Sequence, residues 1–369
     1  MGVLPWFWLA FMDRFGRRPC LLISVFGTMV FNVAGGFCKS YGSQLFTRVL
    51  AAAFICPPCA LGSVVVTELF FREQRGSKIG WWKFSFTIGT PLGPFIMGFV
   101  APRLGVSWIF WINACSNFFL LLGYLFFGPE TLYLRQTHSE FRPSRLDTLF
   151  RFPRIDPRPF DLAELLKPFE LLKEIKIVTP ICVYSIVFTY ANILQLVEIP
   201  QIFEEKFHLG AQGLGLQCVS IILGVSLGEQ VGGRLPDFWM RKRTAIIGRR
   251  LIEERLYWSY IGLFTVIIGL VIWGVQLQQA EEGHWNVTPD IGSGISSFGG
   301  QIVATVLVTY AVDVNPSRAA EIGLLVNLIR QTWGFVGQIS TFQAYLGLHD
   351  AVGALLFSKN VRVIGVQWN

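Results

Sequence analysis

A short charged run, from Asp13 to Pro19, separates two apolar stretches near the start of this chain. It holds one acid followed by three arginines, and such groups form ion pairs that can break and re-form as neighbouring helices move. The acid could also accept hydrogen bonds at the start of a helix, where glycine permits a turn and proline suits the first helical position. We interpret this run as a helix-to-helix turn with these gate residues: Asp13, Arg14, Gly16, Arg17 and Arg18.

A second run of the same pattern contains Asp237, 224 residues after Asp13. Both runs read acid, three residues and then two bases. We expect the second run to be a loop as well, with these gate residues: Gly233, Asp237, Arg241 and Lys242. A loop that recurs at about half the length of a chain indicates a duplicated bundle of helices, a known transporter arrangement.

The overall composition indicates a protein embedded in a lipid bilayer. Of the 369 residues, 52% are hydrophobic and 15% are charged, and the mean hydropathy is +0.50. A soluble domain carries about 25% charged residues. The composition therefore excludes a nucleic-acid-binding protein, although the net charge is +7. All seven cysteines lie in apolar stretches, so we expect no disulfide framework.

Apolar stretches of membrane-crossing length recur along the chain, since a crossing helix needs about 20 apolar residues. The predicted spans are residues 20–38, 45–66, 80–101, 108–128, 175–197, 213–233, 256–276, 290–311 and 319–339. The predicted fold is all-α, a polytopic membrane protein with two pseudo-symmetric helical bundles. Residues 1–128 form the first bundle, 129–174 a cytoplasmic linker with an amphipathic helix over 160–172, and 175–369 the second bundle.

The two ends of the chain fit this pattern less well. Only 12 residues precede Asp13, so the first helix is incomplete and we expect truncation at the N-terminus. Residues 340–369 hold no full apolar span, which leaves truncation at the C-terminus open.

Basic residues divide unevenly between the predicted loops. Five expected inner regions (13–19, 72–83, 135–176, 234–255 and 318) hold 24 of the 31 lysines and arginines. The expected outer loops hold three: Lys39, Arg103 and Lys206. Because cytoplasmic loops of membrane proteins collect Lys and Arg, this asymmetry predicts that the linker lies in the cytoplasm.

With its two related charged runs, the chain resembles the major facilitator superfamily, whose loop motif reads Gly-x-Leu-x-Asp-Arg-x-Gly-Arg-Arg/Lys. The first copy departs at Leu9 and the second at Met240, where the motif has glycine. The segment Gly128 to Arg135, with its Pro-Glu-Thr-Leu, resembles the segment that follows the sixth helix in fungal drug:proton antiporter-like members. The resemblance implies alternating access driven by a solute or proton gradient.

A glycine- and proline-rich stretch resembles the fifth-helix motif of antiporters in this superfamily. It consists of Gly89, Pro91, Gly93, Pro94 and Gly98. Glycine lets helices approach closely and proline bends them, so the resemblance implies a helix that flexes and seals against its partner. The alternative is ordinary tight packing. The Gly224, Gly228 and Gly232 ladder is interpreted as packing against a neighbouring helix.

Several polar residues interrupt predicted spans, where a charge is costly unless it is paired or faces water. Arg48 is predicted to be buried and resembles a fourth-helix arginine linked to proton handling; the alternative is an arginine at the outer interface. Arg330, with Asn327 and Gln331 nearby, is interpreted as lining a cavity or joining a buried network. Four further residues could contact substrate or bond between helices: Tyr184, Tyr190, Asn192 and Gln195.

Glu229, near the inner end of its predicted span, could take up a proton or pair with Arg234, and we favour the pair. The acid that often couples protons in this superfamily lies on the first helix, which the sequence does not show. Proton coupling is therefore an expectation from resemblance.

Enzyme chemistry is not indicated. The four histidines have no metal-ligand spacing, and there is no Walker-type phosphate loop, so we expect no catalytic residue, no metal and no cofactor. Cys56 and Cys59 have redox-motif spacing within a predicted span and are interpreted as packing. The segment around Ser296 loosely resembles an intramembrane serine nucleophile, but helix contact explains its small residues better.

The expected function is secondary active transport of a small organic solute or drug, with proton antiport as the candidate coupling. The expected partners are the lipid bilayer and a small-molecule substrate, with no nucleic acid, and the chain is expected to be monomeric. We expect the plasma membrane rather than a vacuolar or other internal membrane. The alternative is a non-transporting fragment or scaffold derived from the transporter fold.

Overall fold

The computed structural model describes residues 2–58, 62, 65–66, 69–70, 75–128, 130–131, 168–248 and 252–337. The described part is helical and contains no strand. The first half contains α1 (Leu4–Phe15), α2 (Arg17–Phe37), α3 (Tyr41–Phe54), α5 (Arg75–Leu104) and α6 (Ser107–Phe127).

The second half begins after the short η1 (Leu171–Lys173), which covers the end of the predicted amphipathic helix; residues 160–167 of that prediction lie outside the described residues. Its elements, in order, are α9 (Ile175–Phe188), the π-helix η2 (Thr189–Leu194), α10 (Gln195–Phe207), α11 (Ala211–Ile247), η3 (Ile252–Leu256), α12 (Tyr257–Gln279), α13 (Thr288–Val314) and η4 (Pro316–Arg318). A further helix covers 319–337.

The all-α membrane fold predicted from hydropathy is confirmed. Seven helices among the described residues are long and apolar enough to cross a membrane, and each overlaps a predicted span. The predicted span over 45–66 is wrong as one continuous helix, because α3 ends at Phe54 and neither Ile55 nor Cys56 is part of a helix. Pro57 and Pro58 follow, and proline disfavours helical geometry in the residue before it.

Two predicted inner loops are partly helical. The prediction of a loop over 233–242 is wrong, since α11 continues to Ile247 and ends where Gly248 adopts a positive φ of 75°. Likewise, α5 begins at Arg75, inside the predicted 72–83 loop. Arginine and lysine are good helix formers, so a helix can continue beyond the hydrocarbon with its charges in water. Charge patterning thus indicates the predicted inner side of these helices but does not show where the helices stop.

The turn at Gly16 agrees with the prediction, because Gly16 has a φ of 92° between α1 and α2. However, α2 starts at Arg17, so Pro19 occupies the third helical position rather than the predicted first. Proline is still tolerated there, because the first N–H groups of a helix have no partner within it.

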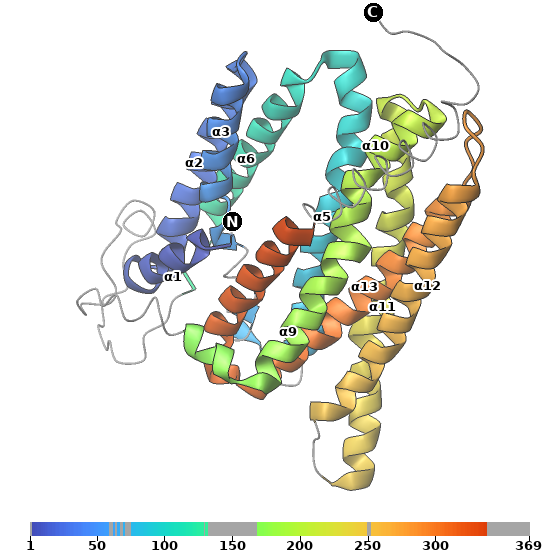
Figure 1. Cartoon of the computed structure of the whole chain (residues 1–369). Coiled ribbons are helices and arrows are strands. Elements are labelled where there is room, and N and C mark those ends of the chain that lie inside the picture. Colours follow the sequence, from blue (N-terminus) through green and yellow to red (C-terminus); the bar gives the residue numbers. More distant parts are fainter. Residues whose placement is uncertain are drawn as a thin grey trace, which may run out of the picture.

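Helix α13 is the centre of the second half and packs against α9, α11, α12 and α5 (Figure 1). The glycine ladder of α11 faces it, which confirms the packing interpretation. A Cβ added at Gly228 would lie 2.5 Å from the carbonyl oxygen of Phe298, and one at Gly232 would lie 2.9 Å from the Cα of Ile302. Backbones that approach so closely gain van der Waals contact, which stabilises helix pairs in lipid.

The first-half helices do not all pack together. Helix α2 packs against α3 and α6, whereas α5 packs chiefly on α11 of the second half (Figure 1). Contact between the predicted halves therefore runs largely through α5, and Trp6 of α1 adds a smaller contact by packing against Leu324. The boundaries of the two bundles and the linker stay a prediction.

We predict that Gly228→Ala lowers the melting temperature of the purified chain, because its methyl group overlaps the α13 backbone. Overpacking of this kind costs about 1–3 kcal/mol. Gly274→Ala in α12 is the control, since no heavy atom among the described residues lies within 4 Å of its added Cβ. Equal melting temperatures for the two variants would contradict the close α11–α13 contact.

Candidate functional site

Lys83 is carried by α5, about two turns after the helix begins at Arg75. The sequence interpretation counted it among the bases of an inner loop, which is wrong, because its side chain is buried inside the bundle. Its Nζ lies 4.9 Å from the ring centroid of Trp82 and 5.0 Å from that of Tyr184. An ammonium group near aromatic rings is stabilised by about 2 kcal/mol or more when it is removed from water.

Arg330 enters the same region from the helix over 319–337. Its guanidinium carbon lies 4.5 Å from the ring centroid of Phe86 and 5.0 Å from that of Phe188, and its terminal nitrogen donates to Asn327 Oδ1 at 2.9 Å. Its buried Nε has no hydrogen-bond acceptor in the described part of the chain. Arg330 and Asn327 thus form the buried network that the sequence predicted, and both line a cavity.

That cavity lies where α5, α13 and the helix over 319–337 meet. Its volume is about 10 Å³, which is room for about one water molecule. Its lining consists of Trp82, Lys83, Phe86, Val308, Val312, Gly323, Val326, Asn327 and Arg330. The structure therefore shows a nearly closed pocket that contains two basic side chains and no acidic one among its described lining residues.

The other predicted pathway residues have different positions. Gln195 donates to Ser296 Oγ at 2.7 Å, so it bonds between helices, as the alternative interpretation held. Asn192 is buried beside Gly300, and Tyr190 is half-buried. Both belong to η2, a π-helical turn, and such turns often occur at functional sites.

Arg48 was predicted either to line a cavity or to lie at the outer interface, and the structure does not bury it within the described part of the protein. Its side chain is exposed, with the guanidinium carbon 5.5 Å from the ring centroid of Phe110. The exposed side of α3 leaves the long arginine stem on the surface, where it packs along an aromatic ring.

Glu229 of α11 lies buried against α13 and α5. Its Oε2 accepts hydrogen bonds from Gln301 Nε2 at 2.8 Å and Thr305 Oγ1 at 2.7 Å, and its Oε1 lies against Gly80. The predicted pair with Arg234 is wrong, since Arg234 is exposed. Residues five apart in a continuous helix point in well-separated directions, and α11 is helical through both.

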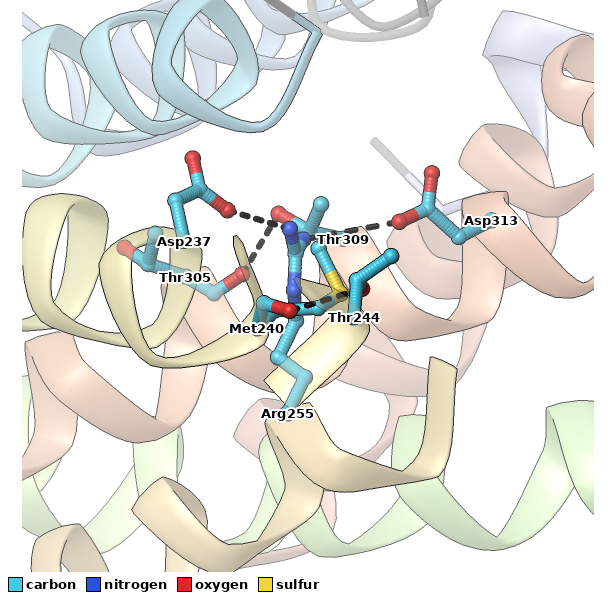
Figure 2. Close-up of polar contacts among 7 residues, drawn as sticks. All are labelled: Asp237, Met240, Thr244, Arg255, Thr305, Thr309 and Asp313. Atoms are coloured by element: carbon cyan, nitrogen blue, oxygen red, sulfur yellow. Dashed lines mark hydrogen bonds and ion pairs between the residues drawn. The ribbon is translucent and has the colours of Figure 1, made fainter. Parts of the chain in front are cut away.

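The second charged run contributes to an ion-pair network toward the C-terminal ends of α11 and α13 (Figure 2). Arg255 of η3 is 3% exposed and contacts two acids, Asp237 at 2.5 Å and Asp313 at 3.6 Å. Arg241 and Lys242, the bases chosen from the motif, are exposed. The cation between the acids thus comes from beyond the motif, where sequence alone marked Arg255 only as one of many inner bases.

The first charged run is joined to the end of α6. The backbone N–H groups of Arg17 and Arg18 donate to the Glu130 carboxylate at 3.0 and 3.1 Å, and the Arg18 guanidinium donates to Leu125 O at 2.7 Å. A carboxylate at a helix N-terminus satisfies unpaired N–H groups and complements the helix dipole. Arg14 is buried, and the side chain of Asp13 lies outside the described residues. Glu130 therefore occupies the helix-start position that the sequence suggested for Asp13.

A family model described as Major Facilitator Superfamily matches residues 1–338. The chain belongs to the Major Facilitator Superfamily. It is a multi-pass integral membrane protein of a transporter family and not an enzyme, as predicted.

Three fungal relatives illustrate the similarity. An uncharacterized transporter of Schizosaccharomyces pombe is 26% identical over 311 residues, which cover 82% of this chain and 62% of that protein. The MFS-type transporter hepF of Aspergillus oryzae is 25% identical, with 84% and 64% covered. The probable efflux pump mfs2 of Aspergillus flavus is 24% identical, with 94% and 83% covered. The chain thus spans less than two thirds of the length of the first two of these relatives.

A solved major facilitator structure has the same fold. The crystal structure of the human organic anion transporter MFSD10 (TETRAN) matches with a TM-score of 0.58 at 16% identity, covering 90% of this chain and 73% of that one. At this identity the match shows the fold alone.

The Gly-Pro stretch of this major facilitator chain lies in α5, which contains Pro91 and Pro94. A Cβ added at Gly98 would lie 2.8 Å from Ala211 O and 3.1 Å from Gly215 Cα, both in α11. Gly89 and Gly93 have no such neighbour within 4 Å among the described residues. One glycine of the motif thus brings α5 and α11 into contact, and the role of the others in bending stays a prediction.

We predict that Arg255→Gln lowers the melting temperature more than Arg243→Gln does. Removing one partner of a buried ion pair costs about 3–5 kcal/mol, whereas an exposed pair contributes about 0–1 kcal/mol. Arg243 serves as the control, because it pairs with Glu254 at 3.7 Å and its side chain is 45% exposed. Adding Asp237→Asn to Arg255→Gln should recover part of the loss, and equal effects of the two arginine variants would refute the network.

Proposed function

We propose that this chain exports a small organic solute across the plasma membrane by alternating access, in exchange for protons. The observation that carries the proposal is the nearly closed pocket between α5 of the first half and α13 and the 319–337 helix of the second. A transported solute needs a site between parts that move relative to each other. The efflux-pump name of the Aspergillus flavus relative supports the outward direction.

Two further contacts suit a cycle in which the halves separate and close. Gly98 packs on Gly215 between α5 and α11, and Arg255 bridges Asp237 and Asp313 near the inner ends of α11 and α13. Small-residue contacts and ion pairs can each break and re-form without unfolding a helix. We propose that they hold one state of the cycle, with the chain acting as a monomer in the bilayer.

We propose Glu229 as the residue that exchanges the proton. Its Oε2 receives two hydrogen bonds, both from uncharged groups, and no salt bridge to it is found among the described residues. An ionised carboxylate so placed is costly in the hydrocarbon region, and protonation removes that cost. Glu229 contacts Gly80, which precedes Lys83 by about one helical turn, so α5 links the proton site to the pocket.

We predict that yeast overexpressing the chain grows on toxic organic compounds that stop the parent strain, and that Arg330→Ala removes this resistance. Arg330 lines the pocket, and its truncation should leave membrane insertion intact. Membrane abundance is measured alongside growth, with exposed Arg103→Ala of α5 as the control. Full resistance in Arg330→Ala would remove Arg330 from the site. No resistance from well-expressed wild-type chain across a broad panel would favour a non-transporting scaffold.

We predict that Glu229→Gln abolishes solute accumulation driven by a pH gradient in membrane vesicles, while solute exchange without a gradient continues. The amide cannot bind and release a proton, but it fills nearly the same space. Asp290→Asn is the matched control, since Asp290 is another buried acid in a predicted span, near the opposite end of α13. Gradient-driven accumulation that survives Glu229→Gln would exclude Glu229 as the proton carrier.

A further inference from the structure

The last turns of α11 project beyond the neighbouring helices at one end of the bundle (Figure 1). They carry three exposed bases in a row: Arg241, Lys242 and Arg243. Arg243 pairs with Glu254 of η3 at 3.7 Å, whereas no ion pair to the other two is found among the described residues. This end of α11 therefore presents positive charge to its surroundings.

A pocket of about 350 Å³ lies beside these bases, where α11 meets η3 and the start of α12. Its lining consists of Trp239, Arg243, Glu254, Tyr257, Trp258 and Ile261. Tryptophan and tyrosine are enriched where lipid headgroups meet the hydrocarbon, because their rings are apolar and their N–H or O–H groups reach water. The lining thus combines a cation with the residue types that are typical of a membrane interface.

The guanidinium of Arg243 is positioned by its neighbours. Its Nε lies 3.7 Å from Glu254 Oε2, and its central carbon lies 5.5 Å from the ring centroid of Trp239. Trp239 Nε1 in turn donates to the same Glu254 oxygen at 3.4 Å. The terminal nitrogens of Arg243 have no acceptor among the described residues. Such N–H groups can donate in parallel to two oxygens of one phosphate group.

We propose that this pocket binds the headgroup of an anionic phospholipid, with Arg243 as the residue that contacts the phosphate. The three exposed bases outnumber the two acids nearby, Glu253 and Glu254, so the surface attracts an anion. Basic clusters beside a spanning helix attract the anionic lipids of the cytoplasmic leaflet, where the predicted orientation places this end of α11. The inference concerns the surrounding bilayer and does not depend on which solute is transported.

Exposed apolar side chains continue from the pocket along α12. Ile261 lines the pocket and is exposed, and a row on the same helix follows at intervals of three and four residues: Tyr260, Phe264, Ile267 and Val271. Acyl chains of a lipid whose headgroup lies in the pocket would cover this surface, which is favourable because it removes apolar area from water. A soluble phosphate ion would gain none of these contacts. The site therefore favours a phospholipid over a free phosphate.

The pocket is connected to the ion-pair network through η3. Glu254 lines the pocket, and the next residue, Arg255, contacts Asp237 and Asp313. A ligand stabilises the arrangement to which it binds. A bound anionic lipid should therefore stabilise η3 in its place beside α11 and raise the melting temperature of the chain.

The test uses the full chain purified in an uncharged detergent, with three probes: dioleoyl phosphatidylserine, dioleoyl phosphatidylcholine and inorganic phosphate. Lipid binding is measured by native mass spectrometry, and each probe is also tested for a shift in melting temperature. We expect phosphatidylserine to bind about tenfold more tightly than phosphatidylcholine and to raise the melting temperature, because only the former adds net negative charge. Inorganic phosphate at the same concentration should cause no shift.

The variants separate a built site from general attraction to positive charge. Arg243→Gln should weaken phosphatidylserine binding about tenfold, since it removes the paired N–H donors. Arg241→Gln and Lys242→Gln remove the same charge outside the pocket lining and should weaken binding about twofold. Arg243→Lys should retain part of the binding, because it keeps the charge without the paired donors. Exposed Arg103→Gln of α5 should leave binding unchanged.

Each variant is first melted without lipid, so that a folding defect in one leaves the others to decide. Equal losses in Arg241→Gln, Lys242→Gln and Arg243→Gln would overturn the pocket as the site and show diffuse attraction only. Phosphatidylcholine that binds as tightly as phosphatidylserine would overturn the choice of an anionic lipid. A shift caused by inorganic phosphate that Arg243→Gln abolishes would show a soluble-phosphate site instead.

Discussion

The hydrocarbon interior of a membrane contains almost no water, so each charge that a helix carries into it must be stabilised by the protein. The chain does this in three ways. Aromatic rings lie beside Lys83 and Arg330, neutral donors bond to Glu229, and two acids flank Arg255. The third arrangement pairs opposite charges directly, whereas the first two surround a charge with neutral groups.

Glycines leave the space in which some of these charges are packed. Gly80 leaves space for the Glu229 carboxylate, and Gly98 brings α5 against α11. Helix α5 therefore touches the buried acid, contributes Lys83 to the pocket and packs extensively on α11 of the second half (Figure 1). A shift of this one helix would change all three at once, which is the physical reason for linking the proposed proton site to the proposed solute site.

Much of the fold could be predicted from the sequence, because lipid imposes a length and a composition on each spanning helix. The positions of seven spans, the turn at Gly16 and the packing of the glycine ladder follow from these local rules. The end of α3 at Phe54 and the extension of α11 to Ile247 were missed. Hydropathy over a window does not register the local effect of Pro57, or a helix that continues into water.

The site was predicted only in part. Mid-span Arg330, Asn327 and Tyr184 could be recognised because polar groups are rare in apolar helices. Lys83 and Arg255 looked like ordinary inner bases, and their burial depends on which helices pack around them. The prediction that Glu229 pairs with Arg234 was wrong for the same reason. Local sequence shows that a charge is present, whereas the tertiary fold determines what compensates it.

The most direct test of the account is whether the pocket opens to both sides of the membrane. Val326 lines the pocket and is 3% exposed, so a single cysteine there, in a chain whose seven native cysteines are replaced, reports on opening. In sealed vesicles of known orientation, the account predicts that a membrane-impermeant maleimide labels this cysteine from the outer face and, separately, from the inner face. Labelling from one face alone, or from neither, in a correctly folded chain would contradict it.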